Sequence, residues 1–343
     1  MPTTIREVAQ AAGVSRTAVS KVLHGKGASV RVSPDKAAAI RAAAERLNYQ
    51  PNALARSLLT GRTHTVGLIF EHLTNISGGP LYYVQLLDGV ASALFNNEYR
   101  LAILPKLDHN NILASLGDGL LEGVVWCKLT RDAEAVRMIG ESPIPIVAMN
   151  APAPELPSKA VYVSCDNEGG MDLAVGHLWD LGHRKILFAH EEEERDTPDC
   201  IARREGFQSA IERRTNGTYR GTVAEWDWDC ERFGPWWENT PDETAIVCWT
   251  ERVAGLVLEQ AKKNGVSVPT QLSVVGFDST PYCEMTSPRL TAVCQPIYEM
   301  ARCASETLLA MIRGEKPPCH SIVFPCTFDV RASTDIPLKV EQT

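Results

Sequence analysis

Several features of exported and membrane proteins are missing from this sequence. No apolar run approaches the roughly 20 residues that a helix needs to cross a bilayer. Residues 1–7 contain neither the apolar stretch nor the small-residue cleavage site of a secretory signal. We therefore expect a cytoplasmic protein that does not associate with membranes.

The common signatures of enzymes and metal sites are also missing. The chain has no nucleophile elbow, no phosphate-binding P-loop, no glycine-rich dinucleotide fingerprint and no metal-ligand spacing. Its ten cysteines are scattered without a C-x-x-C pair, which favours buried, reduced thiols over a disulfide framework or a zinc site. We expect a protein that is not an enzyme and that binds neither a cofactor nor a metal.

Length and charge indicate more than one domain. A chain of 343 residues normally divides into two or three globular units. Its net charge of −8 is unevenly distributed, because residues 1–62 contain ten Lys and Arg against three Asp and Glu, whereas the remainder contains 24 basic and 39 acidic residues. This opposition is typical of a nucleic-acid-binding module joined to a second domain, although a basic face alone is often only a solvated one.

Residues 1–50, here called the headpiece, contain the start signals of three short helices. Thr4 and Glu7 have the spacing of a capping box, and apolar residues follow at helical intervals. Ser15 can cap a second helix after a tight glycine turn, and Ser33, followed by Pro, can cap a third. The spacing predicts an all-α helix-turn-helix unit.

The second helix of such a unit lies in the major groove of DNA, with its N-terminal side chains against base edges. Arg16 can donate two parallel hydrogen bonds to guanine, and Thr17 can offer a hydroxyl to a base or a methyl to thymine. Phosphate contact without base readout is the alternative for each of these side chains, including Lys21. The predicted major-groove residues are Ser15, Arg16, Thr17, Ser20, Lys21 and His24.

Residues 51–63 form a hinge between the headpiece and the rest of the chain. Pro51 ends the third helix, and the following residues offer less than two helical turns, which are marginal alone in water. A plain linker and a short helix stabilised by a partner copy and by DNA both fit this stretch.

Residues 13–23 and 48–58 closely resemble the lactose-repressor (LacI/GalR) family of transcriptional regulators. The resemblance implies a homodimer on near-palindromic double-stranded operator DNA, with a pair of hinge helices in the minor groove. It further implies that Leu58 is inserted between base steps, a role for which an apolar side chain is chemically suited. The implied hinge contacts are Asn52, Ala55, Arg56 and Leu58.

From residue 65 onward, buried β-type runs alternate with helical segments, which predicts doubly wound parallel sheets. The expected strands are 66–70, 101–104, 123–126, 146–149, 161–164, 186–189, 245–249 and 273–277. Ligands in such folds bind beyond the carboxyl ends of the strands. Those ends carry Glu71, Asp166, His190, Trp249 and Asp278.

Most of this region also resembles the periplasmic-binding-protein-like core of the same family, notably at residues 165–170, 181–186, 203–207 and 272–278. The resemblance implies two α/β lobes joined by crossovers, with a small-molecule effector between them. The implied lobes are residues 64–164 with 296–325, and residues 165–293 with 326–340. Residues 64–343 would then form the effector-binding and dimerisation domain.

The resemblance also assigns effector contacts. Asp278 matches a carboxylate that accepts from sugar hydroxyls, and Arg203 matches an effector-contacting arginine, although its neighbour Arg204 leaves open which of the two is a surface charge. Tyr82 and Tyr83 match pocket-facing aromatic residues. Structural alternatives stand beside these roles, because Asp can cap a helix and aromatic residues at a helix start are often core.

Departures from the family pattern leave the effector open. Thr250 and Glu251, preceded by Trp249, stand where relatives commonly carry an Asn-Asp pair whose Asn contacts the ligand, and Trp226 and Trp228 lie near the position where sugar-binding relatives stack a ring. Part of this tryptophan cluster also fits core packing. Rings and carboxylates together favour a carbohydrate over a nucleobase. The predicted effector residues are Tyr82, Tyr83, Arg203, Trp228, Trp249, Thr250 and Asp278.

The sequence therefore predicts a sequence-specific transcriptional regulator, with a repressor favoured, under allosteric control by a sugar or sugar derivative. A nucleobase effector is the alternative within this class. A periplasmic solute-binding protein would share the two-lobed core, but it needs an export signal and has no use for a basic headpiece, so we disfavour it.

Overall fold

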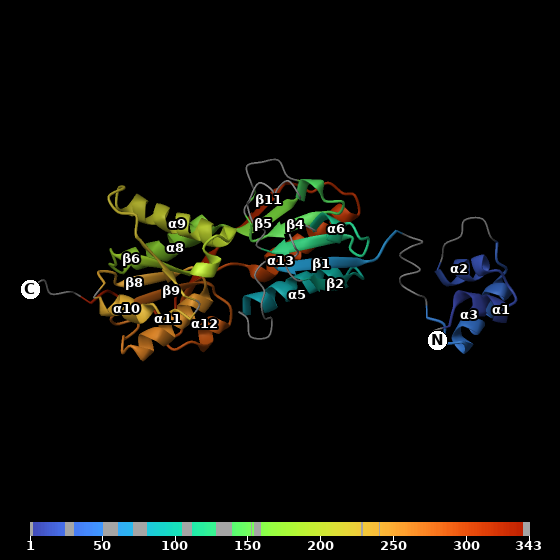
Figure 1. The fold of residues 1–343 in the computed structure, drawn as a ribbon, viewed down its shortest axis with the longest axis horizontal. Coiled ribbons are helices and arrows are strands. Elements are labelled where there is room, and N and C mark those ends of the chain that lie inside the picture. Colours follow the sequence, from blue (N-terminus) through green and yellow to red (C-terminus); the bar gives the residue numbers. More distant parts are fainter. Residues whose placement is uncertain are drawn as a thin grey trace, which may run out of the picture. The chain divides into compact units, whose positions relative to one another are not determined.

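The computed structural model describes residues 3–24, 31–50, 61–70, 81–104, 112–127, 139–151, 153, 159–227, 229–239 and 241–338. The chain divides into two compact units, Met1–Thr63 and His64–Thr343 (Figure 1). The first unit contains the headpiece and the second contains two α/β lobes.

The described headpiece has three helices, α1 (Ile5–Ala11), α2 (Arg16–His24) and α3 (Pro34–Arg46). The Thr4 and Glu7 capping box is formed, and the Oγ atoms of Ser15 and Ser33 accept from backbone N–H groups of the helices that follow them. One residue from each helix is fully buried in a common core: Val8, Val19 and Ile40.

The N-lobe contains a sheet of parallel strands in the order β11-β5-β4-β3-β1-β2. These strands are β1 (Thr65–Phe70), β2 (Arg100–Leu104), β3 (Gly123–Cys127), β4 (Ile146–Met149), β5 (Val161–Cys165) and β11 (Ser321–Phe324). Its helices are α5 (Leu81–Phe95), α6 (Ile112–Leu116) and α13 (Ile297–Ile312). Helices α5 and α13 pack closely at Gly89, where a Cβ atom would lie only 2.8 Å from the Cβ of Ala301.

The C-lobe contains a second sheet in the order β12-β10-β9-β8-β6-β7. These strands are β6 (Ile186–Glu191), β7 (Thr222–Trp226), β8 (Ala245–Cys248), β9 (Ser273–Asp278), β10 (Thr291–Cys294) and β12 (Thr327–Asp329). Helices α8 (Asn167–Asp180) and α9 (Pro198–Arg214) lie on one face, with α10 (Phe233–Glu238), α11 (Glu251–Lys263) and α12 (Tyr282–Met285) on the other (Figure 1).

Each expected strand occurs, with its ends shifted by at most two residues. The main difference is at the edge of the C-lobe, where β12 runs antiparallel to β10. Two residues, 325 and 326, separate β12 from β11, which belongs to the sheet of the other lobe. The other described strand pairs are parallel, so the expected doubly wound parallel sheets are confirmed, with an antiparallel strand at one edge.

In the described parts of the chain, three short crossovers connect the lobes. The chain passes from β5 to α8 at residues 165–166, from β10 to α13 at 295–296, and from β11 to β12 at 325–326. The first and third crossovers run side by side, since the backbone N–H of Asp166 donates to the carbonyl of Phe324 at 2.8 Å. Any movement of one lobe against the other must be absorbed by these few residues.

Candidate functional site

The N-terminal end of α2 presents polar side chains to solvent. Ser15, Arg16 and Thr17 are exposed, whereas the next two residues, Ala18 and Val19, are buried in the headpiece core. This division follows from helix geometry, because residues 18 and 19 lie on the face that packs against α1 and α3.

A groove of about 680 Å³ lies beside the same helix and is lined by Lys21, Val22, Arg31, Val32, Ser33 and Ala37. Lys21 and Arg31 are cations that suit phosphate groups, and Ser20 and Lys21 are half-buried. The surface around α2 therefore offers both base-reading and phosphate-binding chemistry.

Some predicted positions lie outside the described residues. These are the hinge residues Asn52, Ala55, Arg56 and Leu58, together with Glu71 and Trp228. His24 ends α2.

The carboxyl ends of the C-lobe strands carry buried polar groups. Glu191 ends β6, Trp249 directly follows β8, and Asp278 ends β9, and all three side chains are buried. The indole N–H of Trp249 donates to Glu191 Oε2, and Arg252, at the start of α11, forms an ion pair with Glu191. Adjacent parallel strands bring these residues to one edge of the sheet, where ligands of doubly wound folds bind.

Arg203, on α9, is held rigidly beside these groups. Its Nε donates to Asn167 Oδ1 at 3.0 Å and its Nη1 donates to the carbonyl of Trp249 at 2.6 Å. Nη1 also lies 3.6 Å from Asp278 Oδ1, and the guanidinium lies 3.7 Å from the centre of the Phe277 ring. Burial is the largest single influence on Arg203 and lowers its pKa. The nearby acids, of which Asp278 has the strongest effect, together outweigh burial, so the pKa of Arg203 is raised. The neighbouring Arg204 is only half-buried.

Asp278 does not cap a helix. Its Oδ1 accepts from Gln295 Nε2 at 2.6 Å, and the N-cap position of the following helix is Pro281. Asp278 and Ser279 both have positive φ, 95° and 50°, a conformation that costs a non-glycine residue on the order of 1–3 kcal/mol. The turn after β9 is therefore held in an unfavourable conformation by its surroundings.

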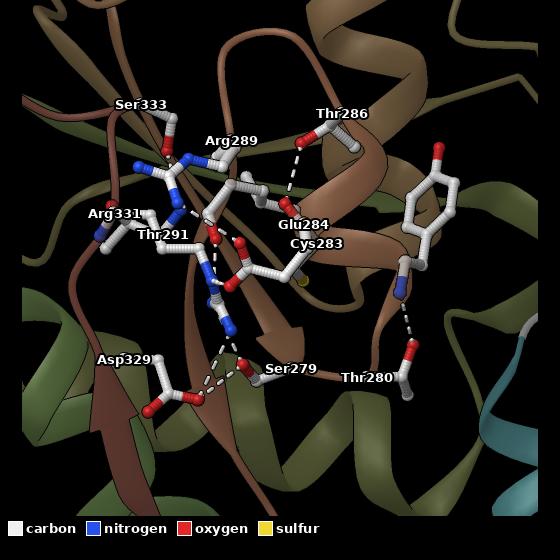
Figure 2. Close-up of polar contacts among 12 residues, drawn as sticks. Ser279, Thr280, Cys283, Glu284, Thr286, Arg289, Thr291, Asp329, Arg331 and Ser333 are labelled. Carbon is white, nitrogen blue, oxygen red and sulfur yellow. Dashed lines mark hydrogen bonds and ion pairs between the residues drawn. The ribbon is translucent and has the colours of Figure 1, made fainter.

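Side chains of β12 and its extension provide part of this support. Ser279 Oγ donates to Asp329 Oδ2 at 2.7 Å and accepts from Arg331 Nη1 at 3.0 Å (Figure 2). Arg331 also donates to the carbonyl of Leu290 at 2.9 Å and to Glu284 Oε1 at 2.5 Å. The chain after the third crossover thus fixes the backbone next to Asp278.

The N-lobe contributes two tyrosines from the start of α5. Tyr82 is buried and its hydroxyl oxygen accepts from the side-chain amide of Asn150, while the ring of Tyr83 lies edge-on to Phe70 at 5.3 Å. Burial raises the pKa of Tyr82, and negative charges that include Asp199 and Asp278 of the other lobe raise it further. Residues of both lobes therefore lie within electrostatic reach of one another.

Arg252 is also close to this N-lobe pair. Burial lowers its pKa to about 10, an effect that Tyr282 and Tyr83 partly oppose. The structure thus brings Tyr82, Tyr83, Arg203, Trp249 and Asp278 into one region, together with Asn150, Glu191, Asp199, Arg252 and Gln295, which the sequence reasoning missed. Glu191 could have been found, because the strand-end rule selects it once β6 is extended by two residues.

Other predicted candidates have structural roles. Thr250 is the N-cap of α11 and accepts from Val253 N at 3.4 Å. Trp226 packs against Phe233 and Trp236 in the core, and Asp166 caps α8 by accepting from Gly169 N at 2.9 Å.

His190, which the sequence places at a strand end, is buried within β6, and its Nδ1 contacts the carbonyl of Glu191 at 2.9 Å. Its place in the packed strand, one residue before the strand end, accounts for this contact.

In the part of the chain that the structure describes, no helix has the length and apolar character needed to cross a bilayer. Across the same residues, His, Cys, Asp and Glu side chains do not gather in any group of three or more that could hold a metal ion.

Comparisons with known proteins agree with this architecture. Residues 4–52 match the family described as bacterial regulatory proteins, lacI family, and residues 175–334 match a periplasmic binding protein-like domain. The chain is 30% identical over 327 residues to the transcriptional repressor PurR of Vibrio campbellii, covering 91% of this chain and 93% of that protein. It is 29% identical over 343 residues to catabolite control protein A of Priestia megaterium, covering 97% and 100%.

Solved structures are similar over almost the whole chain. A complex of the transcriptional regulator CelR with cellobiose has a TM-score of 0.71 and 26% identity, covering 96% of this chain and 99% of that one. A Lac repressor dimer bound to operator and the anti-inducer ONPF has a TM-score of 0.81 and 19% identity, covering 98% and 100%, a likeness of fold.

A helix-turn-helix headpiece joined to a two-lobed core with a polar site at its strand ends defines the class of DNA-binding transcriptional regulators that carry a small-molecule sensor. These relatives are regulators and not enzymes. This chain belongs to the lacI family of bacterial regulatory proteins.

Proposed function

We propose that this protein is a homodimeric repressor that reads a near-palindromic operator through α2 and is controlled by an uncharged sugar bound between its lobes. The major-groove contacts would be Ser15, Arg16, Thr17, Ser20, Lys21 and His24, and the minor-groove contacts Asn52, Ala55, Arg56 and Leu58. The observation that carries the DNA-binding part is the exposure of residues 15–17 at the N-terminal end of α2. The DNA-bound Lac repressor dimer, which shares the fold, supports the assembly.

Replacing Arg16 by Ala tests the readout. DNA selected by the wild-type protein from a random library serves as operator, and fluorescence anisotropy at fixed salt measures its affinity. We expect Arg16→Ala to lose about 1–3 kcal/mol of discrimination between this operator and scrambled DNA, because a bidentate contact to guanine is worth that much. Arg41→Ala is the matched control, since Arg41 is an exposed cation on α3. An equal loss of affinity for operator and for scrambled DNA would mean that Arg16 contacts only phosphate.

The charges of the site support an uncharged polyhydroxyl effector. Three buried acids, Glu191, Asp199 and Asp278, accompany two arginines, Arg203 and Arg252, which already have carboxylate partners among them. An anionic ligand would add repulsion, whereas sugar hydroxyls can donate to carboxylates. The complex of the similar regulator CelR with cellobiose supports the same ligand class.

A nucleobase effector is the second candidate, since aromatic rings line the site at Tyr82, Tyr83 and Trp249. Stacking a flat base requires a ring with a free face. The Tyr82 side chain is buried against Tyr83 in an edge-on contact at 5.3 Å, and Trp249 is buried with the Arg203 guanidinium 5.7 Å from its ring centre. This packing favours the sugar.

Isothermal titration with cellobiose, smaller neutral sugars, a sugar phosphate and purine bases separates the two. We expect a neutral sugar to bind and the sugar phosphate not to bind. Asp278→Asn should weaken neutral-sugar binding by about tenfold or more, because a hydrogen bond to a charged group contributes about 1.5–3 kcal/mol. Glu259→Gln is the control, because Glu259 is an exposed carboxylate on α11, outside the cluster that supports Asp278. If only the purine bases bind, the sugar proposal is wrong and the effector is a nucleobase.

A further inference from the structure

Two cysteines meet where the lobes are joined. Cys165 is the last residue of β5 and opens the first crossover, and Cys326 lies in the third crossover, between β11 and β12. The parallel pairing of β5 with β11 places Cys165 opposite Phe324, two residues before Cys326. The two thiols lie close enough to shift each other's pKa. A disulfide between them would join the two crossovers directly after the existing pairing of β5 with β11.

The surroundings make Cys165 the more nucleophilic of the two. The neighbouring Cys326 thiol lowers the pKa of the Cys165 thiol against the opposing effect of burial, and the positive charge of Arg203 lowers it further. The neighbouring Cys165 thiol, followed by burial, raises the pKa of Cys326. Cys165 thus suits the attacking thiolate, and Cys326 suits the thiol that resolves it.

Access to the pair is also present. Cys165 is buried, but it lines a groove of about 410 Å³ together with Asp166, Asn167 and Val323. Cys326 is half-buried. A small oxidant can therefore approach from the groove.

We propose that Cys165 and Cys326 form a reversible oxidation site for hydrogen peroxide or an organic hydroperoxide, whose product is a disulfide that joins two of the three crossovers. The Cys165 thiolate attacks the terminal peroxide oxygen and the O–O bond breaks. The leaving hydroxide of hydrogen peroxide, or the leaving alkoxide of an organic hydroperoxide, takes a proton to form water or an alcohol. The Cys326 thiol then attacks the sulfenic sulfur of Cys165, an S–S bond forms, and the sulfenic hydroxyl leaves with the thiol proton as water. Two thiols lose two electrons and the peroxide gains them. A low-molecular-weight dithiol reverses the reaction by thiol–disulfide exchange.

The bridge would act on both the crossovers between the lobes and the effector site. It closes a covalent ring through the first and third crossovers, which must adjust when one lobe moves against the other. Cys165 Sγ also donates to Asn167 Oδ1 at 3.5 Å, the atom that accepts from Arg203. Oxidation removes this donor and so alters the support of Arg203. The effect on effector response rests on the proposed function, whereas the chemistry of the pair does not.

The chemistry is tested by counting thiols and mapping peptides after peroxide treatment of the folded full-length protein. Cys319→Ser serves as background, because Cys319 is exposed and could link separate chains. We expect the loss of two thiols per chain and a linked Cys165–Cys326 peptide that dithiothreitol releases. Cys165→Ser and Cys326→Ser should form no such link, while Cys303→Ser, which replaces a half-buried thiol on α13, should behave like the background.

The linked peptide is sought in the wild-type protein, so the test remains valid even if one of the Cys→Ser variants fails to fold. A link between other cysteines, or conversion of Cys165 to sulfinic acid without a link, would overturn the site. Amide hydrogen exchange at residues 165–166 and 326, in the absence of effector, measures how far the bridge restrains the crossovers. Slower exchange in the bridged protein is expected, and equal exchange in the two forms would overturn the restraint.

Discussion

At the scale of single residues, Glu251 shows how tertiary burial changes the chemistry of a side chain. Glu251 begins α11, and its carboxylate accepts from the backbone N–H of Thr280 at 2.8 Å, from Thr280 Oγ1 at 2.5 Å and from Cys283 Sγ at 3.3 Å. Burial is the main reason that its pKa rises to about 7, and the nearby charge of Asp278 adds to it. The three donors lower the pKa but do not outweigh burial.

This elevated pKa predicts that Glu251 makes the core less stable as the pH rises. Below pH 4.5 the group is protonated in both folded and unfolded chains, and it contributes nothing to the pH dependence. Between pH 4.5 and about 7 the unfolded chain loses this proton first, so the free energy of unfolding falls, by on the order of 3 kcal/mol in total. Above that range the penalty is constant.

Urea unfolding of wild type and Glu251→Gln at several pH values measures the effect. The amide cannot ionise, so we expect the variant to gain stability relative to wild type as the pH rises from 5 to 8. Parallel pH profiles of the two proteins would show that Glu251 ionises normally.

At the scale of elements, the turn between β9 and α12 depends on β12 and its extension. The positive φ angles of Asp278 and Ser279 are stabilised by Asp329 and Arg331, which follow the third crossover (Figure 2). Because Asp278 is a proposed effector contact, the crossover segment reaches the site directly. This contact is one physical route by which lobe movement and effector binding can influence each other.

Arg331→Met should therefore destabilise the core by about 1–3 kcal/mol, because it leaves the carbonyl of buried Leu290 and the half-buried Ser279 hydroxyl without their donor. Arg331 is only 12% exposed, while Arg289 in the same cluster is 63% exposed and contacts Glu284 at 3.4 Å. Arg289→Met should change stability by less than about 1 kcal/mol, as is typical of an exposed ion pair. Thermal unfolding of both variants gives the comparison, and equal effects would mean that Arg331 is not a support of the turn.

At the scale of the whole molecule, charge separates the two functions. Residues 1–62 carry an excess of seven positive charges and the remainder an excess of fifteen negative charges. Electrostatic attraction to DNA is thus confined to the unit Met1–Thr63, while the unit His64–Thr343 repels it. The division suits a regulator, because the sensor does not bind DNA by charge alone.

A fragment of residues 64–343 should consequently lose operator binding and keep the effector affinity of the full chain. Anisotropy with operator DNA and calorimetry with the same sugar measure these two properties. The full chain should in addition show a linear fall of log affinity with log salt concentration, because phosphate contacts release counterions. Operator binding by the fragment, or an affinity of the full chain that salt leaves unchanged, would contradict this division.

The headpiece and the course of the strands follow from sequence alone. Thr4 with Glu7, Ser15 with Ala18 and Ser33 with Lys36 are contacts over three residues, so their spacing encodes them directly. Buried strands are likewise continuous apolar runs, which the sequence displays without knowledge of the fold. The resemblance to a family extended these local signals to the two-lobed core, which the comparisons confirm.

Only the tertiary structure decided which side chains meet at the candidate effector site. Arg203 meets Trp249 and Asp278 from a different helix, and Glu191 gains Arg252 as a partner only because β6 and β8 are neighbours. Trp226 is a core residue because its strand packs against Phe233 and Trp236 of α10. Cys165 and Cys326 meet because β5 and β11 pair in parallel. Local spacing determines caps and strands, whereas contacts between distant segments depend on the order of strands and the packing of helices on them.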